Sequence, residues 1–263
     1  MHRSKRIWGI VVRHLFAWPR NLENLAETFW WPTFDLVIWG FTASYLAKNQ
    51  DQTSQLVAFF IGGVIFWMFV YRSQQEMGGV FLWEVWERNI LNILVTPLSI
   101  WEFLFSSLII GLIKICMTTI WLSLIAVLLF SFNITKFGFI LIPFFINLLL
   151  VGWSAGFVIN GLIIRYGQRI QSFAWSMILL IYPFSAVFYP LDSLPSSMQL
   201  VASFLPTSYI FEGMRMVLAG ERVYVTALIL ASLLNAVYLA CSLWFFKKQF
   251  ESSLKMGMLV KFS

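Results

Sequence analysis

The sequence predicts an all-α protein that crosses a membrane six times. Sixty per cent of its 263 residues are hydrophobic and only 11% are charged, so a water-soluble fold could not bury its apolar surface. The apolar runs are long and nearly uncharged, which favours spanning helices over the alternating strands of an outer-membrane barrel. Basic residues gather on one side of these runs. Together these features predict a polytopic protein with a single transmembrane domain over residues 1–263.

The first twenty residues, 1–20, predict an amphipathic helix at the membrane interface. Apolar and basic side chains separate onto two sides of a helix that Pro19 ends. The basic side holds Arg3, Arg6 and Arg13, and the apolar side holds Ile7, Trp8, Val11, Leu15 and Trp18. This pattern is typical of a helix that floats on an anionic leaflet, which makes membrane lipids an expected partner. A solvated basic leader is the alternative.

Six apolar runs follow as candidate spans. They are residues 28–47, 56–71, 99–130, 139–164, a fifth that begins near 173 and meets Pro183 before it has fully crossed, and 224–246. About 20 helical residues cross a hydrocarbon layer of about 30 Å. The run over 99–130 is longer than that, so part of it should tilt or protrude.

The distribution of Lys and Arg orients these spans. With the amino terminus in the cytosol, the cytosolic set is Arg3, Lys5, Arg6, Arg13, Arg20, Arg72, Arg88, Arg165, Arg169, Lys247, Lys248, Lys255 and Lys261. The opposite side holds only Lys48, Lys136, Arg215 and Arg222. The positive-inside rule therefore predicts a multi-pass protein of the inner (plasma) membrane with both termini in the cytosol.

Residues 76–97 predict a helix that lies flat on the cytosolic side. On a helical wheel the apolar arc is Leu82, Trp83, Trp86, Ile90, Ile93 and Leu94, and the polar arc is Glu84, Glu87, Arg88, Asn89, Asn92 and Thr96. Gly78 and Gly79 loosen the chain before this helix, and Pro97 ends it. Such a helix could pass a push from a soluble partner into the spans. It could equally rest at the lipid headgroups.

Residues 183–215 form a proline-interrupted segment that is still largely apolar. Pro183, Pro190, Pro195 and Pro206 exclude one straight helix, and open backbone facing lipid would leave polar groups unsatisfied. A pair of short re-entrant helices in the outer leaflet satisfies both conditions and indicates the exit end of a pathway. An extracellular loop packed on the surface is the alternative.

Two charged residues fall within the predicted spans. Asp35 lies early in the first and Lys114 near the middle of the third, where a central Asp or Lys costs about 2.5 to 3.5 kcal/mol. One interpretation makes them pathway or gating residues, paired with each other. The other has each satisfied by a nearby backbone or hydroxyl group.

The sequence holds no recognisable catalytic or metal-binding constellation. His2 and His14 lie in the leader, far from any pair of carboxylates or thiols, so no catalytic residue, metal ligand or cofactor is assigned to this chain. No G-x-x-x-x-G-K-[ST] phosphate loop is present, so the chain is not expected to hydrolyse ATP itself. The net charge of +6 comes from cytosolic anchoring residues, which does not imply a nucleic-acid partner.

Several motifs in order resemble the type 2 permease family of ABC exporters, which includes polysaccharide, lipid and drug exporters. They follow the basic leader as Glu87-Arg88-Asn89 through Leu94 to Thr96-Pro97-Leu98, then Arg165-Tyr166-Gly167, then Pro183-Phe184, Tyr189-Pro190, Leu194-Pro195, Leu205-Pro206, Tyr209, Glu212 and Arg215. The resemblance covers nearly the whole chain. Many members carry Asn-Pro where this chain has Leu205-Pro206, so the capping of that turn is expected to differ.

The resemblance implies a function and its partners. Two copies of the chain would export an amphipathic substrate (a lipid, a glycan-lipid or polysaccharide, or a hydrophobic drug) together with two ATPase subunits that bind ATP and Mg. Coupling to the ATPase would involve Trp83, Glu84, Trp86, Glu87, Arg88 and Asn92. The exit region would involve Pro183, Tyr189, Pro190, Pro195, Pro206 and Arg215.

Two other classes stay open. A secondary transporter is also polytopic, although such proteins commonly show inverted repeats and broken helices near the midplane. An integral-membrane enzyme acting on lipids needs a polar cluster near one interface, and Ser208, Tyr209 and Glu212 are the only weak candidates.

Overall fold

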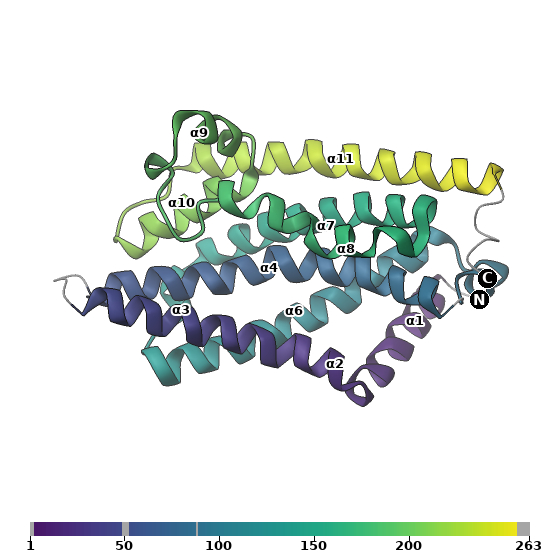
Figure 1. The fold of residues 1–263 in the computed structure, drawn as a ribbon, viewed down its shortest axis with the longest axis horizontal. Helices are drawn as coiled ribbons and strands as arrows, with labels where there is room; N and C mark the ends of the chain where they lie inside the picture. The colour runs from purple at the N-terminus through teal and green to yellow at the C-terminus, as the bar shows by residue number, and fades with distance from the viewer. Residues whose placement is uncertain (1–2, 49–52, 88, 257–263) are drawn as a thin grey trace.

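The computed structural model describes residues 3–48, 53–87 and 89–256, and these residues contain helices and connecting turns but no strand (Figure 1). The α-helices are α1 Arg3–Ala17, α2 Leu22–Leu25, α3 Trp31–Ala47, α4 Thr53–Trp86, α5 Ile90–Val95, α6 Ile100–Phe130, α7 Leu141–Tyr166, α8 Gln171–Ser176, α9 Ser196–Ser203, α10 Pro206–Leu218 and α11 Val225–Lys255. Shorter turns are η1 Trp18–Arg20, η2 Ala26–Trp30 (a π-helix), η3 Ile134–Ile140, η4 Gly167–Ile170, η5 Met177–Leu180, η6 Tyr182–Phe184 and η7 Leu191–Ser193.

Helix α4 is the axis of the bundle. It runs most of the bundle's length and packs against α3, α6 and α7 (Figure 1). Every residue from Ile61 to Val70 is buried. A helix that is apolar all round belongs in the interior of a bundle, because it has no polar face to present to a surface. The other long helices keep much of their surface outward, as lipid-facing helices do.

The predicted flat helix over 76–97 is wrong in its first half. Helix α4 continues without a break to Trp86, and only α5 follows as a separate short helix. Gly78 does not loosen the chain, because it lies against Ile159 of α7, where a Cβ would come within 3.2 Å of that side chain. Close packing of this kind offsets the low helix propensity of glycine. The 34 residues of α4 span about 51 Å, more than the hydrocarbon thickness.

Four described helices are long and apolar enough to cross a membrane. They are Gln55–Trp86, Ile100–Phe130, Ile134–Tyr166 and Val225–Lys255, and they correspond to the second, third, fourth and sixth predicted spans. The predicted first span is α3, which has 17 residues and follows the π turn η2. The predicted fifth is an apolar series of short helices over Gln171–Phe184. A six-span topology therefore remains a prediction.

The two ends of the bundle carry different elements. Helix α1 lies at the end where α4 and α11 finish, and α9 and α10 lie at the opposite end (Figure 1). Prolines shape this second end, since Pro206 begins α10 and Pro195 precedes α9. The two helices are separate because Phe204 and Leu205 turn the chain between them.

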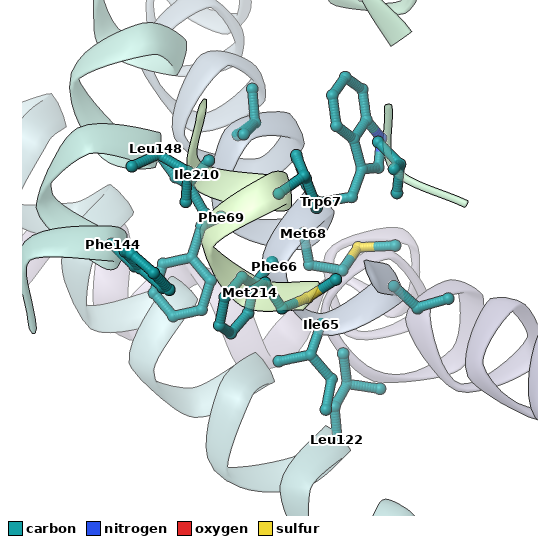
Figure 2. Close-up of a cluster of buried hydrophobic side chains, with 14 of the residues drawn as sticks. Ile65, Phe66, Trp67, Met68, Phe69, Leu122, Phe144, Leu148, Ile210 and Met214 are labelled. Carbon is teal, nitrogen blue, oxygen red and sulfur yellow. The ribbon is translucent and has the colours of Figure 1, made fainter. Parts of the chain in front are cut away.

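The buried side chains form two hydrophobic clusters along the bundle. In the first, Ile65 to Phe69 of α4 meet Leu122 of α6, Phe144 and Leu148 of α7, and Ile210 and Met214 of α10 (Figure 2). The second gathers side chains nearer α1 and the ends of α4 and α11; among its members are Met77, Phe81, Phe103, Phe157 and Phe246. On α4 the first cluster ends at Val70 and the second begins at Met77. The residues between them, 72–76, are polar and buried.

Small residues bring α7 against α4 at this polar stretch. A Cβ at Gly152 would collide with Ser73 Oγ and lie 2.5 Å from the carbonyl oxygen of Val70. One turn later, a Cβ at Gly156 would lie 2.6 Å from Met77 Cβ. The Gly-x-x-x-Gly spacing therefore lets two helix backbones approach closely, which is how helices associate in membranes.

We expect Gly152→Ala to lower the thermal unfolding midpoint of the purified protein. The new methyl group would meet a backbone carbonyl that cannot turn aside, so overpacking should cost about 1 to 3 kcal/mol. Gly9→Ala in α1 is the matched control, because nothing lies within 4 Å of its added Cβ. An unchanged midpoint for the Gly152 variant would show that α4 and α7 do not pack as described.

Candidate functional site

Helix α1 is attached to the bundle by two carboxylates. Arg6 donates through its guanidinium to both oxygens of Glu102 at the start of α6, with the Nε bond at 3.1 Å. This hydrogen bond raises the pKa of Arg6 above its ordinary value. Arg13 forms an ion pair with Glu84 of α4, and His14 Nε2 lies 3.2 Å from the same carboxylate oxygen. The basic side of α1 thus faces bundle carboxylates as well as the membrane surface.

Glu84 is not on an exposed coupling face, contrary to the prediction. It is buried, and it accepts hydrogen bonds from Arg13 and from Asn89 Nδ2, the latter at 2.6 Å. The continuation of α4 turns this residue towards α1, and a carboxylate in that position needs cationic partners. Glu84 therefore joins α1, α4 and the turn after α4.

Three other residues of the predicted coupling region, Trp83, Glu87 and Asn92, are exposed. Trp83 is 37% exposed and donates from Nε1 to Glu87 at 2.8 Å. Asn92 is exposed and donates to Asn89 at 3.1 Å. Ile93 is buried in the second hydrophobic cluster and anchors α5. Trp86 is half-buried beside Trp83, and Arg88 lies outside the described residues. We call the outward set of Trp83, Glu87, Asn92 and Val95 the end surface.

A buried ionic network occupies the polar stretch between the hydrophobic clusters. Glu76 accepts from Arg72 and from Lys114 Nζ, each at 2.7 Å. Arg72 also donates to Thr28 Oγ1 at 3.2 Å and lies 3.9 Å from the Glu27 carboxylate. Two acids and two bases make the network neutral, as a low-dielectric interior requires.

This network corrects two predictions. Lys114 is paired with Glu76 and not with Asp35. Arg72 is buried inside the bundle and does not sit at a cytosolic surface. The predicted second span ends at Tyr71, one residue before Arg72, whereas α4 continues past both. Two signals of a buried network were present in the sequence: Lys114 lies within an apolar run, and Arg72 and Glu76 are four residues apart, on one helical face.

Two glutamines next to this network hold the segment over 171–184. Gln74 Nε2 donates to the carbonyl of Ala174 at 2.9 Å, and Gln75 Nε2 donates to that of Trp175 at 3.1 Å. The chain tightens there from α8 into the 3-10 turn η5, which leaves carbonyl groups in need of donors. A broken helix is therefore held against α4 beside the ionic network.

Two cavities lie on either side of the network. The first has a volume of about 480 Å³ and lies between α3, α4 and residues 171–184; its lining is Glu27, Trp31, Pro32, Asp35, Trp39, Trp67, Met68, Tyr71, Arg72, Gln75, Trp175, Leu179 and Tyr182. We call it the aromatic cavity. The second, of about 320 Å³, reaches from His14 and Trp18 to Lys114, Trp83 and Glu87. Glu27, Gln75 and Trp175 line both.

A series of aromatic rings leads from the aromatic cavity towards α10. Trp67 lies 4.4 Å from Tyr182 between ring centroids, and Trp39 lies 4.4 Å from Phe188. Phe188 stacks on Phe60 at 5.3 Å. The Arg215 guanidinium lies 5.0 Å from the ring centroid of the neighbouring Phe59. The two cavities and this series of rings form one line along the bundle.

Arg215 holds the proline-rich segment in place. It donates to the carbonyl of Ala186 at 2.7 Å and to Glu212 at 2.8 Å, and Glu212 also accepts from the backbone of Leu191 at 2.7 Å. Ala186 has φ +54°, a conformation that costs a residue with a Cβ about 1 kcal/mol or more. Tyr189 donates to the Pro183 carbonyl, while Pro190 precedes η7. The segment is therefore an ordered structure built on α10.

The three candidate enzyme residues in this region have structural partners. Ser208 donates to Ala202 at 2.7 Å, Tyr209 donates to Ser203 at 2.8 Å, and Glu212 is paired with Arg215. Ser208 and Tyr209 hold the turn between α9 and α10, whereas Glu212 joins α10 to the start of η7. In the part of the chain that the structure describes, no group of three or more His, Cys, Asp or Glu is placed to hold a metal ion.

A family model described as ABC-2 type transporter matches residues 12–219, which include the end surface, the ionic network, both cavities and the proline-rich segment. No curated protein matches the chain at a significant level.

We expect Lys114→Met to destabilise the folded protein by about 3 to 5 kcal/mol. The substitution removes one of the two cations that pair with the buried Glu76 carboxylate. The measurement is the thermal unfolding midpoint of the purified protein in detergent. The double variant Glu76→Gln/Lys114→Met removes one charge of each sign and leaves Arg72 beside Glu27. The double variant should recover part of the stability that Lys114→Met loses. If its loss equalled the sum of the losses of the two single variants, Glu76 and Lys114 would not be coupled as described.

Proposed function

Because the chain belongs to the ABC-2 type transporter family as a membrane permease, we propose that two copies of it export an amphipathic substrate, driven by two separate ATPase subunits. The observation that carries the proposal is the line of two cavities and aromatic rings between the end surface and the proline-rich segment. ATP and Mg would bind to the ATPase partners. The chain would supply the route and the moving parts.

The end surface supports the ATPase docking step. Trp83, Glu87, Asn92 and Val95 face outward, whereas Ile93 fixes α5 to the second hydrophobic cluster. A partner that pressed on α5 would push directly on the end of α4, because Asn89 and Glu84 join the two helices. Helix α4 is unbroken from there to the ionic network and both cavities. A force applied at one end would therefore reach the route without passing through a flexible loop.

The apolar outer surface of α3 supports pairing of two copies. Trp31 is exposed at the aromatic cavity, Phe34 is exposed beside Trp31, and Leu180 is exposed on the broken segment. A second copy packed on this side would cover the cavity and complete its wall. The substrate would then be sheltered from lipid as it moves towards α9 and α10.

The charge distribution supports the orientation. The end that carries α1 and the last turns of α11 holds Arg3, Lys5, Lys247 and Lys248, which fits the cytosolic side under the positive-inside rule. We propose six spans, with α3 and residues 171–184 as the first and fifth, and both termini in the cytosol. The plasma membrane, which is the inner membrane in a two-membrane cell, is the proposed location. There α9 and α10 would line the outer, exit end.

One observation favours a secondary transporter as the second candidate. The broken segment over 171–184 lies beside a cavity, and discontinuous helices surround substrate sites in such transporters. The energy source separates the two functions. The test is transport by the reconstituted permease with and without its ATPase, in liposomes. Export should require ATP and be blocked by vanadate, and transport by the permease alone along an ion gradient would refute the proposal.

We expect Glu87→Lys to reduce both transport and substrate-stimulated ATP hydrolysis several-fold while leaving membrane insertion intact. The change reverses a charge on the end surface and removes the acceptor of the Trp83 hydrogen bond. The measurement is ATPase stimulation and export in the reconstituted complex, and Arg88→Glu should act in the same direction.

Glu251→Lys is the matched control for this charge reversal. Glu251 is an exposed acid near the end of α11, at the same end of the bundle, and it should tolerate the same change. Normal coupling in the Glu87 variant, or equal losses in the two variants, would remove the end surface from the mechanism.

A further inference from the structure

We propose that the aromatic cavity binds an organic cation with an apolar body, and that Asp35 is the group that recognises its charge. This names a narrower substrate class than the amphipathic cargo inferred above. It rests on the proposed function in that it takes the aromatic cavity as part of the transport route. The binding step itself needs no ATPase.

The charges around the cavity leave one carboxylate in excess. Glu27 and Glu76 are balanced by Arg72 and Lys114 in the buried network. Asp35 lines the same cavity, but no hydrogen bond or ion pair joins it to another residue that the structure describes. Three acids and two bases therefore give this region a formal charge of −1 when Asp35 is ionised.

A second acceptor in the cavity is also without a donor. Gln75 Nε2 donates to the Trp175 carbonyl, which can only accept, so the amide orientation is determined by its partner. The Gln75 Oε1 atom is buried and has no hydrogen-bond partner among the described residues. Nε of Arg72 is a buried donor without a partner beside it, and the other two guanidinium nitrogens of Arg72 contact Glu27, Glu76 and Thr28. A buried acceptor without a donor therefore lies in the same cavity as the unpaired Asp35 carboxylate.

The remaining walls suit the apolar body of a cation. Trp31, Trp39, Trp67 and Trp175 line the cavity. Tyr71 and Tyr182 lie within electrostatic reach of the Asp35 carboxylate. Aromatic faces attract organic cations through their quadrupoles, and they hold apolar groups by area burial. A carboxylate beside such faces therefore binds a lipophilic cation better than a neutral or anionic molecule of the same shape.

The position of Asp35 argues against a purely structural role. A carboxylate within an apolar helix of the membrane is costly unless it has a partner, and Asp35 is exposed to the cavity with none. If it were only a packing group, a buried donor from α4 or α8 would be expected beside it, as Lys114 lies beside Glu76. A cationic substrate would supply the missing charge while it is bound.

The test is equilibrium binding to the purified full-length chain in nanodiscs of phosphatidylcholine. Tetraphenylphosphonium and tetraphenylborate are the probes, since they share size and shape and differ in the sign of their charge. Binding to empty nanodiscs is subtracted. The wild-type chain should show saturable binding of tetraphenylphosphonium, and Asp35→Asn should weaken it about tenfold, the size of one charge or cation–π contact. The affinity for tetraphenylborate should not fall.

Two control variants separate charge recognition from loss of fold. Asp35→Glu keeps the charge and should retain most of the affinity. Asp192→Asn removes an exposed carboxylate of η7 that does not line the cavity, and it should bind like the wild type. The proposal is overturned if wild-type binding is not saturable, if Asp35→Asn binds the cation normally, or if it loses both probes equally.

The cation-binding test and the ATP-driven export test can fail independently of each other. ATP-driven export with no preference for the cation would remove this inference and leave the transporter intact. Cation binding without ATP-driven export would do the reverse.

Discussion

The structure depends on a neutral ionic network inside a membrane bundle. Glu76 holds two cations, Arg72 and Lys114, and Arg72 reaches Thr28 and Glu27. These contacts join α4 to α6 and to the turns before α3. Removing any one charged partner would leave an unbalanced charge where water cannot easily solvate it. The network therefore specifies how three helices lie relative to one another, in a part of the core where hydrophobic packing alone would permit sliding.

The same network lies between two halves of the molecule that are held together by different contacts. On one side, Glu84 ties the end of α4 to α1 and to Asn89 before α5, and Glu102 ties α1 to α6. On the other side, Arg215 and Glu212 secure the proline-rich segment on α10. Both cavities border the network, so a movement that altered its ion pairs would change both cavities together.

Close packing of helices makes that link rigid. The glycines of α7 let its backbone approach the backbone of α4 closely. On α6, a Cβ added at Gly111 would lie 3.2 Å from Glu76 Cβ. Small residues on two neighbouring helices therefore allow Glu76 to reach Lys114. Interiors packed in this way transmit a displacement over several helical turns, because they have little room to absorb it.

The sequence by itself determined the membrane class, the apolar runs and the places where proline stops a helix. These are local properties, since hydropathy sums over neighbouring residues and proline acts on its own turn. It also indicated that Asp35 and Lys114 needed partners. Only the tertiary structure decided that Lys114 meets Glu76, that Glu84 turns inward to α1 and that residues 72–76 stay inside the bundle. Those outcomes depend on distances between residues 38 or more positions apart, which no local pattern contains.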